Sequence, residues 1–454
     1  MSSNKLEKCL TNYIKTGKVM KSKLEIRTWF LEDKNQRLYV RNRKVFRMVI
    51  LTSIFYLLTS NLHAQTIDDY FKIASENNPE LKAKHKEFEA ALQRVSQVNT
   101  LPDPTFSFGY FISPVETRVG PQQARFSLTQ MFPWFGALKT QGDAAALMAE
   151  AKFQLFMDAR NKLYFKVAAA FYPLYELNDW IKIEAKNIRI LESYKTITTK
   201  KFENGNGSMV DVLRVDIMLK DAQTNLKILK EKEKPLITIF NKLLNRPENE
   251  PVVMVDSLKT ESLPENFRKD SLLAANPTLK ALDLKLEASK ATELAASKQG
   301  LPKFGIGLDY VMVGKRNDVI MPDNGKDVIM PMVTMTIPIF RGKYNASVKE
   351  AQLMQESYAY QKEEMTNNLL SNYEMVWFEI QQQEQLLALY EQQIQTVEQS
   401  LSLLFTSYGN SGKEFEEVLR MQQQLLKYQK IRATALTQYQ IAIAKINYLT
   451  SKKY

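Results

Sequence analysis

The residues best able to bind a ligand are five methionines that lie close together, Met312, Met321, Met330, Met332 and Met335. Thioether sulfur is a soft ligand of the kind that suits Cu(I). Methionine also fills irregular apolar surface, because its side chain is flexible and polarisable. The cluster therefore predicts either a soft-metal site or a packing role, and its spacing does not decide between them.

Side chains for catalysis are scarce. The chain has two histidines, His63 and His85, and one cysteine, Cys9. It contains no GxSxG, HExxH or Walker pattern. A catalytic triad or a histidine or thiolate metal site needs more of these groups than the chain supplies. We therefore predict neither an enzyme nor a bound cofactor.

The positive charge of the chain is concentrated at its N-terminus. The 454 residues carry a net charge of +12. Residues 1–47 hold 13 Lys and Arg against 4 Asp and Glu, so their +9 leaves only +3 for residues 65–454. A chain so evenly charged offers no basic face to a nucleic acid. No nucleic-acid partner is expected.

A targeting segment follows this basic stretch. Met48 to Ser60 is an uncharged, mostly apolar run, shorter than the ~20 residues that span a bilayer. Basic residues precede it and the small residue Ala64 follows it, so 48–64 is predicted to be a secretory signal cleaved after Ala64. The close positive flank disfavours the alternative, a buried core helix. Residues 1–47 are then either a cytoplasmic extension or the product of a start codon placed too early.

The remaining chain contains one unit twice. Two short sequences recur 198 residues further on and a third recurs 206 further on, which places the extra residues between these markers, in the second hairpin. The pairs are Asn78–Ala83 with Asn276–Ala281, Pro104–Gly109 with Pro302–Gly307, and Val212–Arg214 with Val418–Arg420. Such self-similarity predicts two repeats, 65–265 and 266–454, each with the order helix, strand, strand, long helix, turn, helix.

Four segments alternate large apolar residues with small or polar ones, as strands between two different environments do. The side rich in Gly, Ser and Thr suits a water-filled lumen, and the apolar side suits a core or lipid. Loops are expected at 113–122 and 313–330. The predicted strands are Thr105–Phe111, Arg125–Phe132, Phe304–Met312 and Val333–Ile337.

Two very long helices are predicted, near 137–202 and 343–408. The second contains no Gly or Pro before Gly409, and ~66 residues at 1.5 Å each would reach about 100 Å. Apolar residues recur every seven positions, which is typical of a coiled coil. The repeating positions are Tyr373, Ile380, Leu387, Ile394 and Leu401, with Val376, Gln383, Tyr390, Val397 and Leu404 three residues after each.

The fold class is therefore mainly α with a small β part. Four strands cannot close a barrel, and an open sheet edge is not tolerated in lipid. Several chains must share one barrel, and three chains would supply twelve strands, within the known range. Helices of about 100 Å attached to that barrel would form a tunnel.

These features together resemble the TolC-type outer membrane efflux proteins. The resemblance covers about 65–454 and rests on the tandem halves, the Asn-Pro-x-Leu-Lys-Ala helix starts and the Phe-Pro-Trp-Phe-Gly sequence that begins at Phe132. That last sequence is similar to the heavy-metal (copper and silver) branch. Two helical tips also match, through Gly205, Asn206, Gly207 and Ser208 in the first half and Gly409, Asn410, Ser411 and Gly412 in the second.

The resemblance implies a homotrimer in the outer membrane, with a twelve-stranded barrel and a periplasmic helical tunnel. It implies a passive duct that meets a periplasmic adaptor protein and an inner membrane pump of the RND or ABC type. The tip residues above would contact the adaptor. The cargo, whether drug, metal cation or protein, is not implied.

The family's gate is an acidic ring after the second tip, and this chain departs from that pattern. The matching residues include two arginines where the family has acidic residues, so the ring could close by ion pairs. Charges that merely decorate a solvated helix end are the alternative. The gate candidates are Asp211, Arg214, Glu416, Glu417 and Arg420.

One other class of protein shares several of these features. A soluble periplasmic coiled-coil adaptor or scaffold would also carry a signal and heptads. It would have no use for two hairpins with apolar outer faces, or for a tandem repeat around them. A requirement for detergent separates the two hypotheses.

Overall fold

The computed structural model describes residues 66–254, 258, 260, 262–265, 267–318, 320–411 and 415–452, without the side chains of Asn410 and Ser411. The predicted extension at 1–47 and the predicted signal at 48–64 lie outside the described residues. The two repeats belong to one unit of the chain, residues 64–454.

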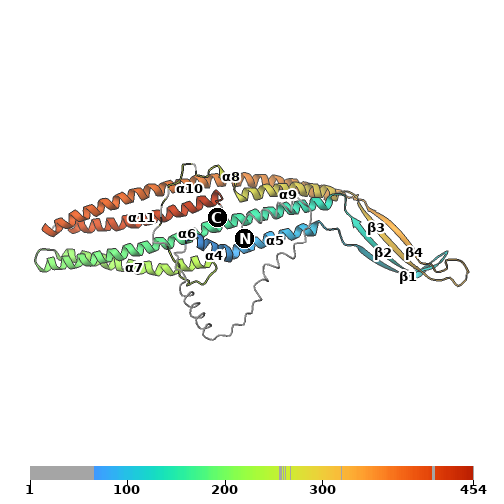
Figure 1. Cartoon of the computed structure of the whole chain (residues 1–454), viewed down its shortest axis with the longest axis horizontal. Coiled ribbons are helices and arrows are strands. Elements are labelled where there is room, and N and C mark those ends of the chain that lie inside the picture. Colours follow the sequence, from blue (N-terminus) through green and yellow to red (C-terminus); the bar gives the residue numbers. More distant parts are fainter. Residues whose placement is uncertain are drawn as a thin grey trace, which may run out of the picture. The chain divides into compact units, whose positions relative to one another are not determined.

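Each half of this unit has the same order of elements (Figure 1). The fold class predicted from the sequence is confirmed: long helices dominate, with a small four-stranded sheet. A helix α4 (Ile67–Asn77) precedes the first set, and a single turn α8 (Ser271–Ala274) precedes the second. The first set is α5 (Pro79–Val98), β1 (Thr105–Thr117), β2 (Gly120–Phe132), α6 (Ala137–Glu203) and α7 (Met209–Leu243). The second set is α9 (Pro277–Gln299), β3 (Lys303–Val313), β4 (Val328–Thr336), α10 (Gly342–Ser411) and α11 (Phe415–Leu449).

The repeated Asn-Pro sequences start helices for the same local reason in both halves. The side chain of Asn78 accepts a hydrogen bond from the Leu81 amide at 3.1 Å, and Asn276 does the same for Leu279 at 3.1 Å. Proline follows as the first helical residue, where its missing N–H removes no helical bond. An asparagine cap with proline behind it is a strong helix start.

The first hairpin is longer than predicted. Residues 113–122 were expected to form a loop, but 115–117 pair with 120–122 and leave a connection of two residues. Gly120 makes this possible: its φ is +133°, and a Cβ there would lie 1.8 Å from the Gly314 carbonyl oxygen. The connection between β3 and β4 is longer, 314–327. The second hairpin, 303–336, is therefore six residues longer than the first, 105–132, so most of the eight extra residues of the second repeat lie in its hairpin, as predicted.

The heptad seam of the second long helix is buried at five of its ten predicted positions and half-buried at the other five, Gln383, Leu387, Tyr390, Ile394 and Leu404. Tyr373, Val376 and Ile380 belong to one hydrophobic cluster with α9 and α11 residues. Val397 and Leu401 belong to another, which contains residues of α6, α7, α10 and α11. Helix α6 packs against α5, α7, α9 and α11, and α10 packs against α9 and α11. The long helices are therefore held together by separate hydrophobic clusters along their length.

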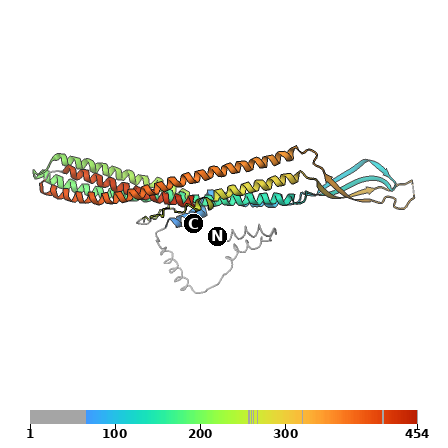
Figure 2. The same cartoon turned by 90° about the horizontal axis from the view of Figure 1, so that it is seen from above.

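The sheet and the helix-connecting turns lie at opposite ends of the long helices (Figure 2). The four strands pair antiparallel in the order β1-β2-β3-β4. The turns between α6 and α7 and between α10 and α11 are more than 65 residues from the strands along the chain. These two ends, called the sheet and the tip below, carry the candidate functional residues.

Candidate functional site

One face of the sheet is apolar and exposed. The register places the apolar residues of neighbouring strands side by side, for example Phe106 with Leu128 and Ile306 with Val333. Phe108 is 59% exposed, Ile306 64% and Val333 81%. Water disfavours so much contiguous apolar surface, which marks a face covered by lipid or by protein. This apolar face comprises Phe106, Phe108, Tyr110, Phe126, Leu128, Phe304, Ile306, Leu308, Tyr310, Ile329, Val333 and Met335.

The opposite face of the same strands, called the polar face, carries the charged and hydroxyl side chains together with Met131, Val311, Met330 and Met332. Ser127 lies beside Asp309 in the register, and Thr129 lies beside Gly307. Arg125 makes an ion pair with Asp309 across β2 and β3. The alternation predicted from the sequence thus places Arg125 and Asp309 on one face, and the paired Phe residues of the strands on the other. Lipid on one side and water on the other would produce this pattern.

The two outer strands each have an open edge. Among the described residues, β1 pairs only with β2, and β4 pairs only with β3. Their outward N–H and C=O groups need partners in a dry environment. None of the described helices is long and apolar enough to cross a membrane.

The tip turn of the first half is tightly specified. Gly205 has φ +74°, a left-handed conformation that glycine adopts without strain. Its amide donates to the Phe202 carbonyl, and the Asn206 amide donates to the Lys201 carbonyl, which closes the end of α6. Ser208 then caps α7 by accepting from the Val210 amide at 3.1 Å. Gly207 passes close to Lys201.

The tip turn of the second half is described in part. Gly409 is exposed near the end of α10. The side chains of Asn410 and Ser411, and the whole of Gly412, lie outside the described residues.

The structure brings three of the five gate candidates together. Arg214 of α7 contacts Glu416 of α11 at 2.9 Å and Asp211 at 3.9 Å. This links the two repeats, whose matching residues lie about 200 positions apart. Glu417 and Arg420 instead pair with each other within α11. Arg214 and Arg420 are thus both engaged by acidic partners.

Asp211 is the least exposed of the tip acids, with 16% of its side chain accessible. Burial raises the pKa of its carboxyl, the Arg214 guanidinium opposes that shift, and the Glu416 carboxylate adds to it. A raised pKa favours the protonated form, so Asp211 is poorly satisfied as an anion. The single guanidinium of Arg214 is therefore the shared ion-pair partner of the Asp211 and Glu416 carboxylates.

A second link between the repeats was not predicted from the sequence. Lys201 of α6 donates to the Tyr408 carbonyl of α10 at 2.6 Å, and its ammonium lies 4.2 Å from the centre of the Tyr408 ring. The Tyr408 ring is buried against Phe415, with centroids 4.6 Å apart. The cation caps the free carbonyls of a helix end, where positive charge is favoured. A basic residue near a helix end is a common signal, but it does not identify the helix that it caps.

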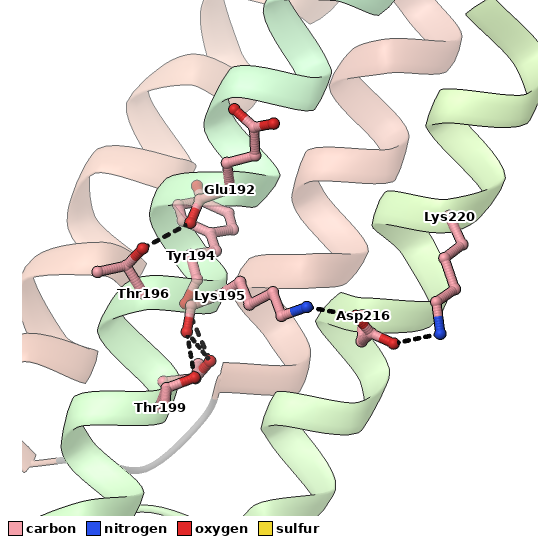
Figure 3. A network of polar contacts seen from close by, with 8 residues as sticks. Glu192, Tyr194, Lys195, Thr196, Thr199, Asp216 and Lys220 are labelled. Carbon is pink, nitrogen blue, oxygen red and sulfur yellow. Dashed lines mark hydrogen bonds and ion pairs between the residues drawn. The ribbon is translucent and has the colours of Figure 1, made fainter. Parts of the chain in front are cut away.

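Behind the tip, α6 and α7 are fastened by a polar network (Figure 3). Asp216 of α7 accepts from Lys195 of α6 at 2.5 Å and from Lys220 at 2.7 Å. These two bonds lower the pKa of the Asp216 carboxyl to about 2. Asp216 therefore stays ionised at any physiological pH.

A buried polar seam joins α6 to α11. Glu184 is fully buried and pairs with Lys430, and Gln422 donates to Asn187 at 3.1 Å. The Trp180 indole donates to the Lys430 carbonyl at 3.2 Å. Burial of a carboxylate is tolerated because it is paired. The sequence shows these residues only as polar interruptions in long helices.

Both the sequence and the fold of this chain are similar to those of known outer membrane proteins. Residues 269–450 match the outer membrane efflux protein family. The described fold is similar to that of the outer-membrane channel OprN, at 16% identity over 85% of this chain and 90% of that one, with a TM-score of 0.72. It is also similar to the outer membrane protein VceC of Vibrio cholerae, at 16% identity over 85% of this chain and 95% of that one, with a TM-score of 0.68. A third similar structure is the MtrE outer membrane channel of Neisseria gonorrhoeae, at 15% identity over 85% of this chain and 88% of that one, also with a TM-score of 0.68. No curated protein sequence matches the chain.

In this fold the five methionines do not form one group. Met330 and Met332 lie on the polar face, opposite Asp309 and Gly307. Met312 and Met335 lie on the apolar face, and Met321 lies in the connection between β3 and β4. Among the described residues, no three His, Cys, Asp or Glu side chains are placed to hold a metal ion. Met312 and Met335 stay partly exposed on the apolar face, and the Met332 sulfur contacts the Arg125 guanidinium at 3.8 Å.

Proposed function

We propose that this chain is the outer membrane channel of a tripartite efflux system. It provides a passive exit duct for small molecules or metal cations, which an inner membrane pump of the RND or ABC type delivers through a periplasmic adaptor. The apolar face of the sheet, with an open edge on each side, carries the proposal: lipid covers that face, and further copies of the chain pair with those edges. Three chains supply twelve strands, which close the barrel.

The same observation disfavours a soluble adaptor or scaffold. Such a protein would leave about a dozen large apolar side chains in water, on strands whose edges invite aggregation. The helical tip then lies in the periplasm, and the tip residues 205–208 and 409–412 contact the adaptor. The segment 48–64 directs export and is removed after Ala64, which leaves the two repeats.

Fractionation of the cell envelope tests the location and assembly. The mature chain should begin at Gln65, be extracted from the outer membrane only with detergent, and have the mass of three chains in the detergent complex. A periplasmic monomer that needs no detergent would overturn the proposal. Susceptibility of a deletion strain to drugs and to copper or silver salts tests the cargo, and sensitivity confined to the metals would place the chain in the heavy-metal branch.

The tip residues form the gate in this proposal. Arg214 with Glu416, and Lys201 with the Tyr408 carbonyl, tie the first repeat to the second, and both ties must part if the helix ends move away from each other. Glu417 and Arg420 line the same helix end. The Arg214–Glu416 pair is partly exposed, so it contributes at most about 1 kcal/mol, or roughly fivefold in the closed-to-open equilibrium.

Single-channel conductance tests this gate. Arg214→Glu should raise the open fraction, because it places three carboxylates together and removes the tie to α11. The exchange Arg214→Glu with Glu416→Arg should restore the closed state. Arg420→Glu should have a smaller effect, since it breaks a pair within one helix. Unchanged conductance in both single reversals would exclude these residues from the gate.

A further inference from the structure

The polar face of the sheet contains a carboxylate that is hidden behind an arginine. Asp309 of β3 has no exposed surface. Its partner Arg125 of β2 keeps 44% of its side chain exposed. The guanidinium therefore lies between the carboxylate and the open side of the polar face. The exposed group on this face is therefore the positive Arg125 guanidinium, with the negative Asp309 carboxylate buried behind it.

Glycines explain how a strand side chain becomes so deeply covered. A Cβ at Gly305 would lie 2.3 Å from the Thr334 hydroxyl and 2.5 Å from the Met131 sulfur. Side chains of β2 and β4 thus lean over β3 where it has none of its own. Gly307, two residues before Asp309 on the same face, is covered likewise, since a Cβ there would lie 2.9 Å from the Thr129 hydroxyl and 3.6 Å from the Met332 methyl group. Arg125 also touches the sulfur of Met332 at 3.8 Å. The pair is built into the wall of the sheet.

The strands contain only two other charged residues. Glu116 lies at the far end of β1, and Lys303 is the first residue of β3. Over the middle of the four described strands, Arg125 and Asp309 are thus the sole charges. If the polar face lines a lumen, each chain contributes one such pair at one height, and nothing else there offsets the loss of either member.

We propose that the Arg125–Asp309 pair sets the ion preference of the channel at the level of the strands, with Arg125 masking a ring of carboxylates. This inference rests on the proposed function, which places the polar face around a water-filled bore. Rings of acidic side chains favour cations and rings of basic side chains favour anions. The intact pair keeps this level of the bore close to neutral.

Reversal potentials in a planar bilayer with a KCl gradient give the first test. Arg125→Gln should uncover the carboxylates and raise the K⁺ over Cl⁻ permeability ratio by roughly threefold or more. Asp309→Asn should shift the ratio toward Cl⁻, and the double variant should return to the wild-type value. Arg125→Lys should stay close to wild type. Arg316→Gln is the matched control, since it breaks an arginine–aspartate pair outside the strands.

A local measurement separates this inference from the conduction of the whole channel. Ser107, which lies beside Ser127 on the polar face, is changed to Cys, the only cysteine of the mature chain, and its reaction rates with cationic and anionic methanethiosulfonates are compared. Arg125→Gln should raise the cationic-to-anionic rate ratio several-fold, and Asp309→Asn should lower it. Unchanged rate ratios and unchanged reversal potentials would overturn the inference. A wild-type protein that does not conduct would contradict the proposed function instead, while the rate ratios would still test the pair.

Discussion

The sheet and the tip solve the burial of apolar side chains in opposite ways. In the tip, large side chains such as Leu191, Val215 and Val418 turn inward and are fully buried among four helices of one chain. In the sheet, Phe108 and Val333 turn outward and stay exposed. The tip thus has a hydrophobic core within one chain, while Val210, Leu213, Ile217 and Leu403 stay exposed on its surface beside the polar pairs. The sheet needs lipid and further chains before its side chains and edges are satisfied, so assembly should depend on the sheet and gating on the tip.

The largest expected effect comes from a charge on the apolar face. Phe108→Arg should prevent stable insertion, because arginine near the middle of a bilayer costs about 2–4 kcal/mol in each chain. The amount of trimer that detergent extracts from the outer membrane measures how much of the variant inserts stably. Ser107→Arg, one residue away on the polar face, is the matched control and should still assemble. Equal loss in both variants would mean that the two faces do not differ in environment.

A buried pair in the helices should give the next largest effect. Lys430→Met leaves the Glu184 carboxylate buried without its partner, which costs about 3–5 kcal/mol once per chain. Thermal unfolding in detergent should show a much lower midpoint, while the protein still reaches the membrane. Replacing Glu184 with Leu in the same chain should recover most of the loss. Lys152→Met breaks a half-exposed pair with Glu87 and should cost less than about 1 kcal/mol.

The smallest effect concerns the fastening of α6 to α7, and it depends on pH. Bonds from Lys195 and Lys220 hold the pKa of Asp216 at about 2, below its usual value of 3.8. A depressed pKa contributes stability that is present above pH 3.8 and is lost as the pH falls through about 2. Asp216→Asn should therefore lower the midpoint of thermal unfolding at pH 5 to 7, with the difference from wild type shrinking toward pH 2. A pH-independent difference would point to packing rather than to the ionised carboxylate.

The raised pKa of Asp211 predicts the opposite sign at the tip. A carboxyl whose pKa is raised on folding contributes stability below its unfolded pKa, and that contribution is lost as the pH rises through the folded value. Asp211→Asn should therefore raise the unfolding midpoint slightly at pH 7, because the amide needs no countercharge. Comparing the unfolding midpoints of Asp211→Asn and Asp216→Asn at pH 7 shows whether replacing two acids of one helix shifts the midpoint in opposite directions. A lower midpoint at pH 7 would mean that the pair with Arg214 outweighs burial.

The sequence by itself determined the elements, the duplication and the two faces of each strand. Heptad spacing, alternation and Asn-Pro caps are local patterns. They favour a helix or a strand at the residues that form them, whichever part of the protein packs there. The same patterns predicted the family resemblance at the coarse level, which the match of residues 269–450 supports. They did not predict the length of the first hairpin, because only the pairing of β1 with β2 extends strands through 113–122.

Only the tertiary structure decided which charges meet. Arg214 faces Glu416, Lys430 faces Glu184 and Arg125 covers Asp309, each across about 180 to 250 residues of chain. Such pairs depend on the rotation and register of one packed element against another. Polar side chains at these positions look the same in the sequence whether they end in solvent or in a buried pair. The physical reason is that their energies arise from burial and distance, which exist only after the elements have packed.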